Sequence, residues 1–170
     1  MAEWFDLVTE DGVRTGEKAL RSTCHGNPDL LHQAVHIFVV NTQGELFLQK
    51  RSQTKDIQPG KWDTSVGGHV DAGEEPFEAA LRELREELGV EAGEPVFLYH
   101  YLWRSPVESE VIRSFRLSYD GPFQLQASEL DDGRFWSLTE IESTLGKDVF
   151  TPNFEYEWPK IRPYVESVEP

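Results

Sequence analysis

The sequence predicts an α/β fold in which a mixed β-sheet carries a few helices on its faces. Residues 34–40 form an apolar run of strand length. Residues 110–119 alternate apolar and polar side chains, as a half-buried strand does. Residues 76–88 instead repeat apolar side chains at the spacing of a helix. Because strands and helices are interspersed along the chain, we expect one layered α/β sandwich.

Short stretches of high β propensity, separated by turn signals, predict the strands of the sheet. The expected strands are residues 4–9, 13–15, 34–40, 46–50, 62–66, 95–103, 110–119 and 131–138. Two of the turns, at Glu10–Gly12 and Thr42–Glu45, indicate hairpins. Residues 17–31 show no clear pattern apart from a loop at 26–29.

The best-defined helix covers residues 76–88. Pro76 suits a first helical turn, where its missing N–H is not needed, and Gly89 follows the last turn as a C-terminal glycine does. The predicted buried stripe is Phe77, Ala80, Leu81, Leu84 and Leu88.

Two further helices are expected near the C-terminus. Thr139 is predicted to cap a short one, with Glu142 completing a capping box. Another is predicted to begin at Thr151-Pro152, with a length made doubtful by Pro159 and Pro163.

The length of 170 residues suits one domain with a substantial core. We expect an N-terminal hairpin and loop extension (1–33), a core (34–145) and a C-terminal helical segment (146–170). The sequence has no apolar run long enough to cross a membrane and no pattern of a signal peptide. Cys24 is the only cysteine, which excludes an intrachain disulfide and fits a reducing compartment. We therefore expect a cytoplasmic protein.

The net charge of −15 argues against a protein that binds nucleic acid polymers, which needs a basic surface. A phosphate-bearing small molecule would also be repelled at long range, so bound cations and placed Arg or Lys side chains would have to attract it. The oligomeric state is left open, with a homodimer as one option.

Three carboxylates of the predicted helix gather on one patch, because Glu83, Glu86 and Glu87 are related by i, i+3 and i+4. A solvated acidic face, balanced in part by Arg82 and Arg85, is one interpretation. The other is a site for a hard divalent cation, since Mg²⁺ prefers oxygen ligands.

The spacing of specified residues over 68–90, GHVDAGEEPFEAALRELREELGV, favours the cation site. The specified positions are Gly68, Glu74, Arg82, Glu83, Leu84, Glu86, Glu87, Gly89 and Val90. This pattern matches the Nudix box, and the chain resembles the Nudix hydrolases, which hydrolyse a diphosphate linked to another group. The resemblance implies an α/β/α sandwich and Mg²⁺ dependence, with Mn²⁺ as an alternative.

The same resemblance assigns roles to box residues. Glu83, Glu86 and Glu87 would bind Mg²⁺, with the backbone carbonyl of Gly67 as a further ligand. Glu83 is the expected general base, with Glu110 or Glu108 as the alternative. The residues expected to be structural are Gly68, Glu74, Arg82 and Gly89, with Arg82 and Glu74 forming an ion pair that holds the glycine loop against the helix.

Residues 30–69 also run in register with the isopentenyl-diphosphate isomerase branch of this superfamily. That resemblance implies a second metal position at His25, His32, His69, Glu108 and Glu110. Such a ligand set would suit Mn²⁺ or Zn²⁺. It also implies that Arg51, Lys55 and Arg21 bind the substrate's diphosphate. Ordinary loop and strand residues remain the alternative for each of these positions, and His36 is interpreted as structural.

Two positions depart from the isomerase pattern. Gly67 stands where the isomerase carries its catalytic cysteine, and Asn153 stands where it carries an aromatic residue. The box carboxylates, by contrast, are complete. We therefore predict hydrolysis of a diphosphate linkage in a nucleoside-diphosphate-type or prenyl-diphosphate-type molecule. The alternatives are an active isomerase and a non-catalytic module that binds a phosphate ligand.

Overall fold

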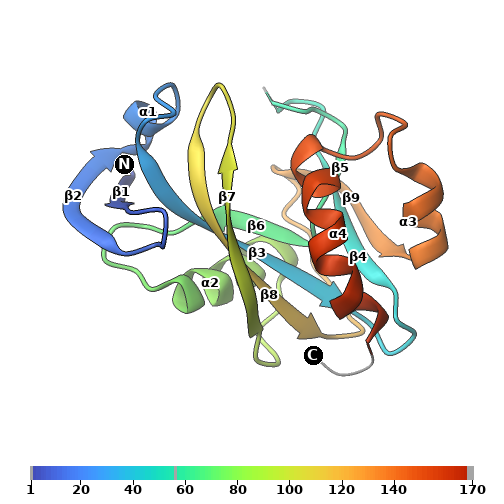
Figure 1. Ribbon diagram of the computed structural model, residues 1–170. Coiled ribbons are helices and arrows are strands. Elements are labelled where there is room, and N and C mark those ends of the chain that lie inside the picture. Colours follow the sequence, from blue (N-terminus) through green and yellow to red (C-terminus); the bar gives the residue numbers. More distant parts are fainter. Residues whose placement is uncertain (1, 56, 168–170) are drawn as a thin grey trace.

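A mixed β-sheet forms the centre of the computed structural model, which describes residues 2–55 and 57–167 (Figure 1). The strands of this sheet are β3 (Leu31–Val40), β4 (Leu46–Arg51), β5 (Trp62–Asp63), β6 (Val66–His69), β7 (Val96–Arg104), β8 (Ser109–Ser118) and β9 (Leu130–Trp136). The main path runs β5-β4-β3-β8-β7, while β6 also pairs with β3 and β9 with β4. β3 and β8 are parallel and β7 is antiparallel to β8, so the predicted mixed sheet is confirmed.

The N-terminal hairpin is also present, as a separate two-stranded sheet of β1 (Trp4–Val8) and β2 (Arg14–Leu20). The second strand is longer than predicted and leads directly into a single helical turn, α1 (Arg21–Cys24). These elements fill the stretch for which the sequence gives no clear pattern. Figure 1 shows the hairpin beside the end of the main sheet where β3 begins.

The longer helices cover opposite faces of the sheet. They are α2 (Pro76–Leu88) and α4 (Pro152–Glu166), and the short α3 (Leu138–Thr144) precedes α4. Side chains alternate along β3, so Val35, Ile37 and Val39 join the core under α2 whereas Phe38 and Val40 join the core under α4. The α/β/α sandwich is therefore confirmed. No helix in the described ranges is long and apolar enough to cross a membrane.

The predicted hairpin of β3 and β4 is only partly right, because the two strands pair at a single position next to the turn, Val40 with Leu46. The predicted strand 62–66 is correspondingly divided into β5 and β6. Ser65 lies where the chain crosses between the diverging strands. Its hydroxyl accepts a hydrogen bond from Val39 N at 2.9 Å and donates one to Phe47 O.

The predicted buried stripe of α2 needs one correction. Ala80, Leu84 and Leu88 are buried, but Phe77 and Leu81 are 38% and 37% exposed, and Ala79 is buried instead. The first turns of α2 border an open groove, which Phe77 shares with Phe97 and Phe115. Phe77 therefore faces this groove, whereas Leu81 borders a smaller pocket with Arg85 and Val90.

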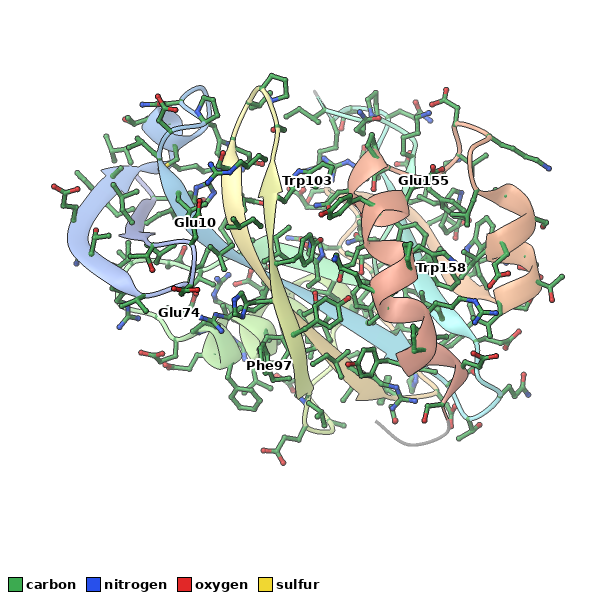
Figure 2. The ribbon with its side chains drawn as sticks, viewed as in Figure 1. Glu10, Glu74, Phe97, Trp103, Glu155 and Trp158 are labelled. Carbon is green, nitrogen blue, oxygen red and sulfur yellow. The ribbon has the colours of Figure 1, made fainter. Side chains whose placement is uncertain are left out.

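Two details near the C-terminus also differ. The N-cap of α3 is Ser137, whose hydroxyl accepts the Glu140 N–H at 3.1 Å, and Thr139 lies inside the helix. α4 continues through Pro159 and Pro163. Its apolar side chains hold it on the sheet despite the missing donors, and Trp158 is one of those that face the core (Figure 2).

Candidate metal and active site

The glycine loop before α2 is held in place by Arg82. Its guanidinium donates to the Glu74 carboxylate at 2.9 and 3.0 Å, so the predicted ion pair is present. It also donates to the backbone oxygen of His69 at 3.0 Å and to Glu83 Oε1 at 2.7 Å. Figure 2 marks Glu74 in this loop. One arginine therefore joins the loop, the end of β6 and the first carboxylate of the patch.

Glu83 lies directly against the backbone of Gly68. A Cβ at position 68 would fall 2.2 Å from the Glu83 carboxylate carbon, so only glycine leaves room for this side chain. Burial raises the pKa of Glu83, the nearby Arg82 charge opposes that shift, and Glu86 adds to it.

Glu87 is the second carboxylate that faces the glycine backbone. It accepts hydrogen bonds from Gly67 N at 3.4 Å and from the Gln49 side-chain amide at 3.1 Å. Burial and the charge of Glu83 raise the Glu87 pKa to about 8. Glu86 is more open, with its side chain 49% exposed and 3.4 Å from Arg82. A divalent cation between these carboxylates would relieve their repulsion, and their oxygen atoms are the donors that Mg²⁺ and Mn²⁺ accept.

A second cluster of ligand-type side chains lies where β3, β6 and β8 meet the turn after α1. One ligand atom from each of His25, His32, His69 and Glu108 lies within 4.8 Å of the others. His25 Nε2 is 2.8 Å from Glu108 Oε2 and 3.3 Å from His69 Nε2. Glu110 completes the group, with Oε1 3.2 Å from His69 Nε2. All five residues implied by the isomerase resemblance are thus brought together; we call them the His/Glu cluster.

The His/Glu cluster is incompletely hydrogen-bonded. His32 is fully buried, and neither of its ring nitrogens has a hydrogen-bond partner among the described residues. Its Nε2 lies 3.5 Å from both glutamates, which is too long for a good hydrogen bond. Buried polar atoms without partners are costly, so these donors fit a bound cation.

The charges of the His/Glu cluster shift its pKa values strongly. Burial opposes protonation of His69, but the nearby carboxylates of Glu108 and Glu110 outweigh it and raise the His69 pKa to about 9. Burial likewise opposes ionisation of Glu108, yet its histidine neighbours lower the Glu108 pKa to about 2. The pKa of Glu110 is lowered for the same reason. The buried ring of Phe5 packs on His32 and His69 at centroid distances of 4.8 and 4.9 Å and shields the cluster.

The three predicted phosphate-binding cations each have a partner already. Arg21 is exposed and pairs with Glu3 at 3.1 Å. Arg51 donates to the backbone oxygen of Ile57 at 3.1 Å and lies 3.7 Å from Asp63. The Lys55 ammonium contacts Glu129.

A further group of polar side chains surrounds Glu157 of α4 and was not predicted from the sequence. His36 donates through Nδ1 to Glu157 Oε1 at 2.7 Å. Tyr99 and Ser114 donate to Oε2 at 2.8 and 2.6 Å. Tyr101 donates to Oε1 at 2.5 Å. We call these five residues the Glu157 cluster. His36, for which a structural role is predicted from the sequence, is buried within it.

The single cysteine is buried and free. Cys24 is 0% exposed, and burial together with the Glu108 charge raises the pKa of its thiol. It is therefore protonated and inaccessible. Gly67, which the sequence predicts to occupy the position of the isomerase cysteine, is partly exposed and pairs with His36.

Comparison with known proteins identifies the family of this chain. The NUDIX domain family matches residues 30–154, most of the chain, and the protein belongs to this family. Its α/β fold and its resemblance to the isomerases are confirmed by the relatives below.

Three relatives illustrate the range. The chain is 36% identical to the uncharacterized Nudix hydrolase YfcD of Shigella flexneri, over 89% of this chain and 82% of that protein. It is 33% identical to an isopentenyl-diphosphate Δ-isomerase of Streptomyces avermitilis, over 96% of this chain and 86% of that one. Nudix hydrolase 3 of Arabidopsis thaliana is 43% identical over 57% of this chain, which spans only 13% of that protein.

Among solved structures, DR0079 of Deinococcus radiodurans superposes with a TM-score of 0.79 at 26% identity, covering 93% of this chain and 98% of that one. The relatives therefore include proteins named as hydrolases and proteins named as isomerases. Choosing between these two activities for this chain depends on its own side chains.

Proposed function

We propose that this protein is a divalent-cation-dependent hydrolase that cleaves a diphosphate linkage in a small molecule. The observation that carries the proposal is the pair of partly buried carboxylates, Glu83 and Glu87, that lie against the backbone of Gly67 and Gly68. Carboxylates held together in this way against their repulsion favour a cation site over a solvated acidic face.

The residues that would hold Mg²⁺ or Mn²⁺ are Glu83, Glu86, Glu87 and the backbone carbonyl of Gly67. The His/Glu cluster would hold a second cation, and its mixture of imidazole and carboxylate donors suits Mn²⁺ or Zn²⁺. A divalent cation supplies positive charge that polarises a phosphoryl group and offsets the charge that develops on its oxygens.

The protein's own side chains then position and activate the water. Glu83 is our choice of general base because Arg82 fixes its orientation and its carboxylate lies against Gly68. Glu110 is the alternative, with Glu108 beside it, but both are engaged by histidines. Arg51, Lys55 and Arg21 would bind phosphate oxygens by exchanging their present acidic or backbone partners for the substrate.

An isomerase is disfavoured because no proton donor stands at position 67 and the Cys24 thiol is buried. A non-catalytic phosphate-binding module would have no use for the complete set Glu83, Glu86 and Glu87. Because an isomerase and a non-catalytic module would also bind a diphosphate, identifying the reaction product distinguishes them from a hydrolase, whereas measuring binding does not.

The test is a product screen with Mg²⁺ over nucleoside diphosphates, sugar nucleotides and prenyl diphosphates. We expect phosphate-containing hydrolysis products from at least one class. Glu86→Gln and Glu87→Gln should lower the rate by on the order of 100-fold or more. Glu91→Gln, an exposed carboxylate just beyond the box, is the matched control and should retain activity. Near-normal rates in both box variants would refute the assignment.

A further inference from the structure

The open groove beside the first turns of α2 lies apart from the candidate active site. Its volume is about 650 Å³, which suits a small molecule. Side chains alternate along β8, so Arg113 and Phe115 line the groove whereas Ser114 faces Glu157 under α4. The groove therefore lies on the sheet face opposite the Glu157 cluster. Its described lining includes neither the carboxylates proposed to bind Mg²⁺ nor any member of the His/Glu cluster.

Three phenylalanines give the groove an aromatic lining. Phe115 is the most buried of them, at 3% exposure. Phe77 of α2 and Phe97 of β7 each pack against it, with ring centroids 6.3 and 5.6 Å from the Phe115 ring. Phe97, which is labelled in Figure 2, is 48% exposed. Because two large rings are left open to water beside a third, a flat apolar group that covered them would be bound favourably.

Arg113 adds a positive charge to this aromatic surface. Its Nε donates to Gln33 Oε1 at 2.9 Å, and its guanidinium carbon lies 5.9 Å from the centroid of the Phe97 ring. The turn of the N-terminal hairpin packs against it, since a Cβ at Gly12 would fall 2.4 Å from Nη2. No carboxylate among the described residues forms an ion pair with Arg113, although the chain carries a net charge of −15.

The other charged side chains at the groove offset each other. Arg14 lies 3.2 Å from Glu75 and 3.2 Å from Asp6. Glu75 supplies the single carboxylate in the described lining of the groove, and Arg14 already pairs with it. The uncompensated charge is therefore that of Arg113, whose planar donors match the two oxygens of a carboxylate. A diphosphate carries more negative charge than this one guanidinium would offset.

We propose that this groove binds a small organic carboxylate with a flat apolar body, such as an aromatic ring. The carboxylate pairs with Arg113, and the apolar body covers Phe77 and Phe97. The site is on the opposite sheet face from the Glu157 cluster, and it needs no divalent cation. The inference therefore goes beyond the proposed function and does not depend on it.

The test compares two probes of the same shape, 2-naphthoate and its neutral analogue 2-naphthamide. Isothermal titration calorimetry measures their dissociation constants with protein freed of divalent cations, so that a bound metal cannot hold the carboxylate. We expect naphthoate to bind at least about 10-fold more tightly than naphthamide, because a hydrogen bond to a charged group contributes that much. Equal affinities, or no saturable binding of naphthoate at millimolar concentration, would overturn the proposal.

Two variants assign the binding to the groove. Arg113→Gln should weaken naphthoate binding by about 10-fold and leave naphthamide unchanged. Arg104→Gln, which alters an exposed arginine of β7 that pairs with Glu10 outside the groove, is its control and should change neither constant. A preference for naphthoate that survives in Arg113→Gln would place the site elsewhere and overturn the proposal.

Phe97→Ser should weaken the binding of both probes, because it removes apolar surface without removing the charge. The matched control is Val96→Ser, which alters an adjacent side chain that is 43% exposed but does not line the groove. This pair remains informative if Arg113→Gln fails to fold. Unchanged naphthoate binding in Phe97→Ser would contradict a site in the groove.

A second copy of the chain is the other occupant that an exposed apolar groove could take. Sedimentation velocity of the unaltered protein and of Phe97→Ser distinguishes it from a small molecule. We expect the same oligomeric state for both proteins. A dimer that dissociates in Phe97→Ser would assign the groove to a second copy and overturn the proposal.

Discussion

The His/Glu cluster and the Glu157 cluster both combine histidine with glutamate on one face of the sheet, on either side of the row formed by Ala34 and Ile112, yet their hydrogen bonding differs. In the first, His32 is buried with both ring nitrogens lacking partners in the described part of the chain. In the second, Glu157 is 1% exposed and accepts from four side chains, His36, Tyr99, Tyr101 and Ser114.

This difference shows where an external ligand belongs. A buried carboxylate with four donors is stabilised by the protein alone, whereas crowded histidines and glutamates without enough hydrogen bonds need a cation to complete them. The residue types in a cluster are thus a poor guide to a metal site. Whether each buried polar atom has a hydrogen-bond partner is a better guide.

The largest expected effect comes from removing the acceptor of the closed cluster. Glu157→Ala should lower the free energy of unfolding by about 3–5 kcal/mol, because it leaves His36 and three hydroxyls buried without their partner. Urea denaturation measures this loss. His25→Ala, in the partly exposed part of the His/Glu cluster, is the comparison and should cost about 1 kcal/mol or less in metal-free protein. Similar losses in the two variants would remove the proposed distinction.

Added metal should stabilise the protein through the His/Glu cluster and not through the Glu157 cluster. Zn²⁺ at about 100 times its dissociation constant should stabilise the protein by about 2.7 kcal/mol. The gain, followed as a shift of the thermal unfolding midpoint, should disappear in His32→Ala, because that side chain is a ligand candidate. His100→Ala alters an exposed histidine outside the cluster and should keep the gain. A shift that survives in His32→Ala would place the cation elsewhere.

A smaller effect is expected when the closed cluster loses one donor. Tyr99→Phe removes one hydrogen bond to Glu157 and leaves three, so the free energy of unfolding should fall by about 1–2 kcal/mol. Chemical denaturation of this variant beside Tyr164→Phe, which changes a nearby ring on α4, isolates the hydroxyl. If the two variants lose the same stability, the hydrogen bond contributes nothing measurable.

The sequence predicts local features far better than the clusters that depend on tertiary contact. α2 is predictable from Pro76 and Gly89, and the helical repeat places Glu83, Glu86 and Glu87 on one patch. The exposure of Phe77 and Leu81 was missed because periodicity identifies an apolar face but not how far the sheet extends beneath it.

Local sequence patterns do not predict the His/Glu cluster or the Glu157 cluster. The His/Glu residues come from separate segments, and only the resemblance to the isomerases grouped them. Nothing in the sequence relates His36 to Glu157, which lie 121 positions apart and meet only when α4 packs on the sheet. Phe5 likewise gave no signal beyond its place in a predicted strand.

The most direct test of the central claim is hydrolysis in ¹⁸O-labelled water with Mg²⁺, using the best substrate of the product screen. We expect ¹⁸O in a phosphate-containing product from the unaltered protein and almost no labelled product from Glu87→Gln. Conversion of isopentenyl diphosphate to its isomer without uptake of ¹⁸O, or undiminished labelling by Glu87→Gln, would contradict a hydrolase that works through the carboxylates of α2.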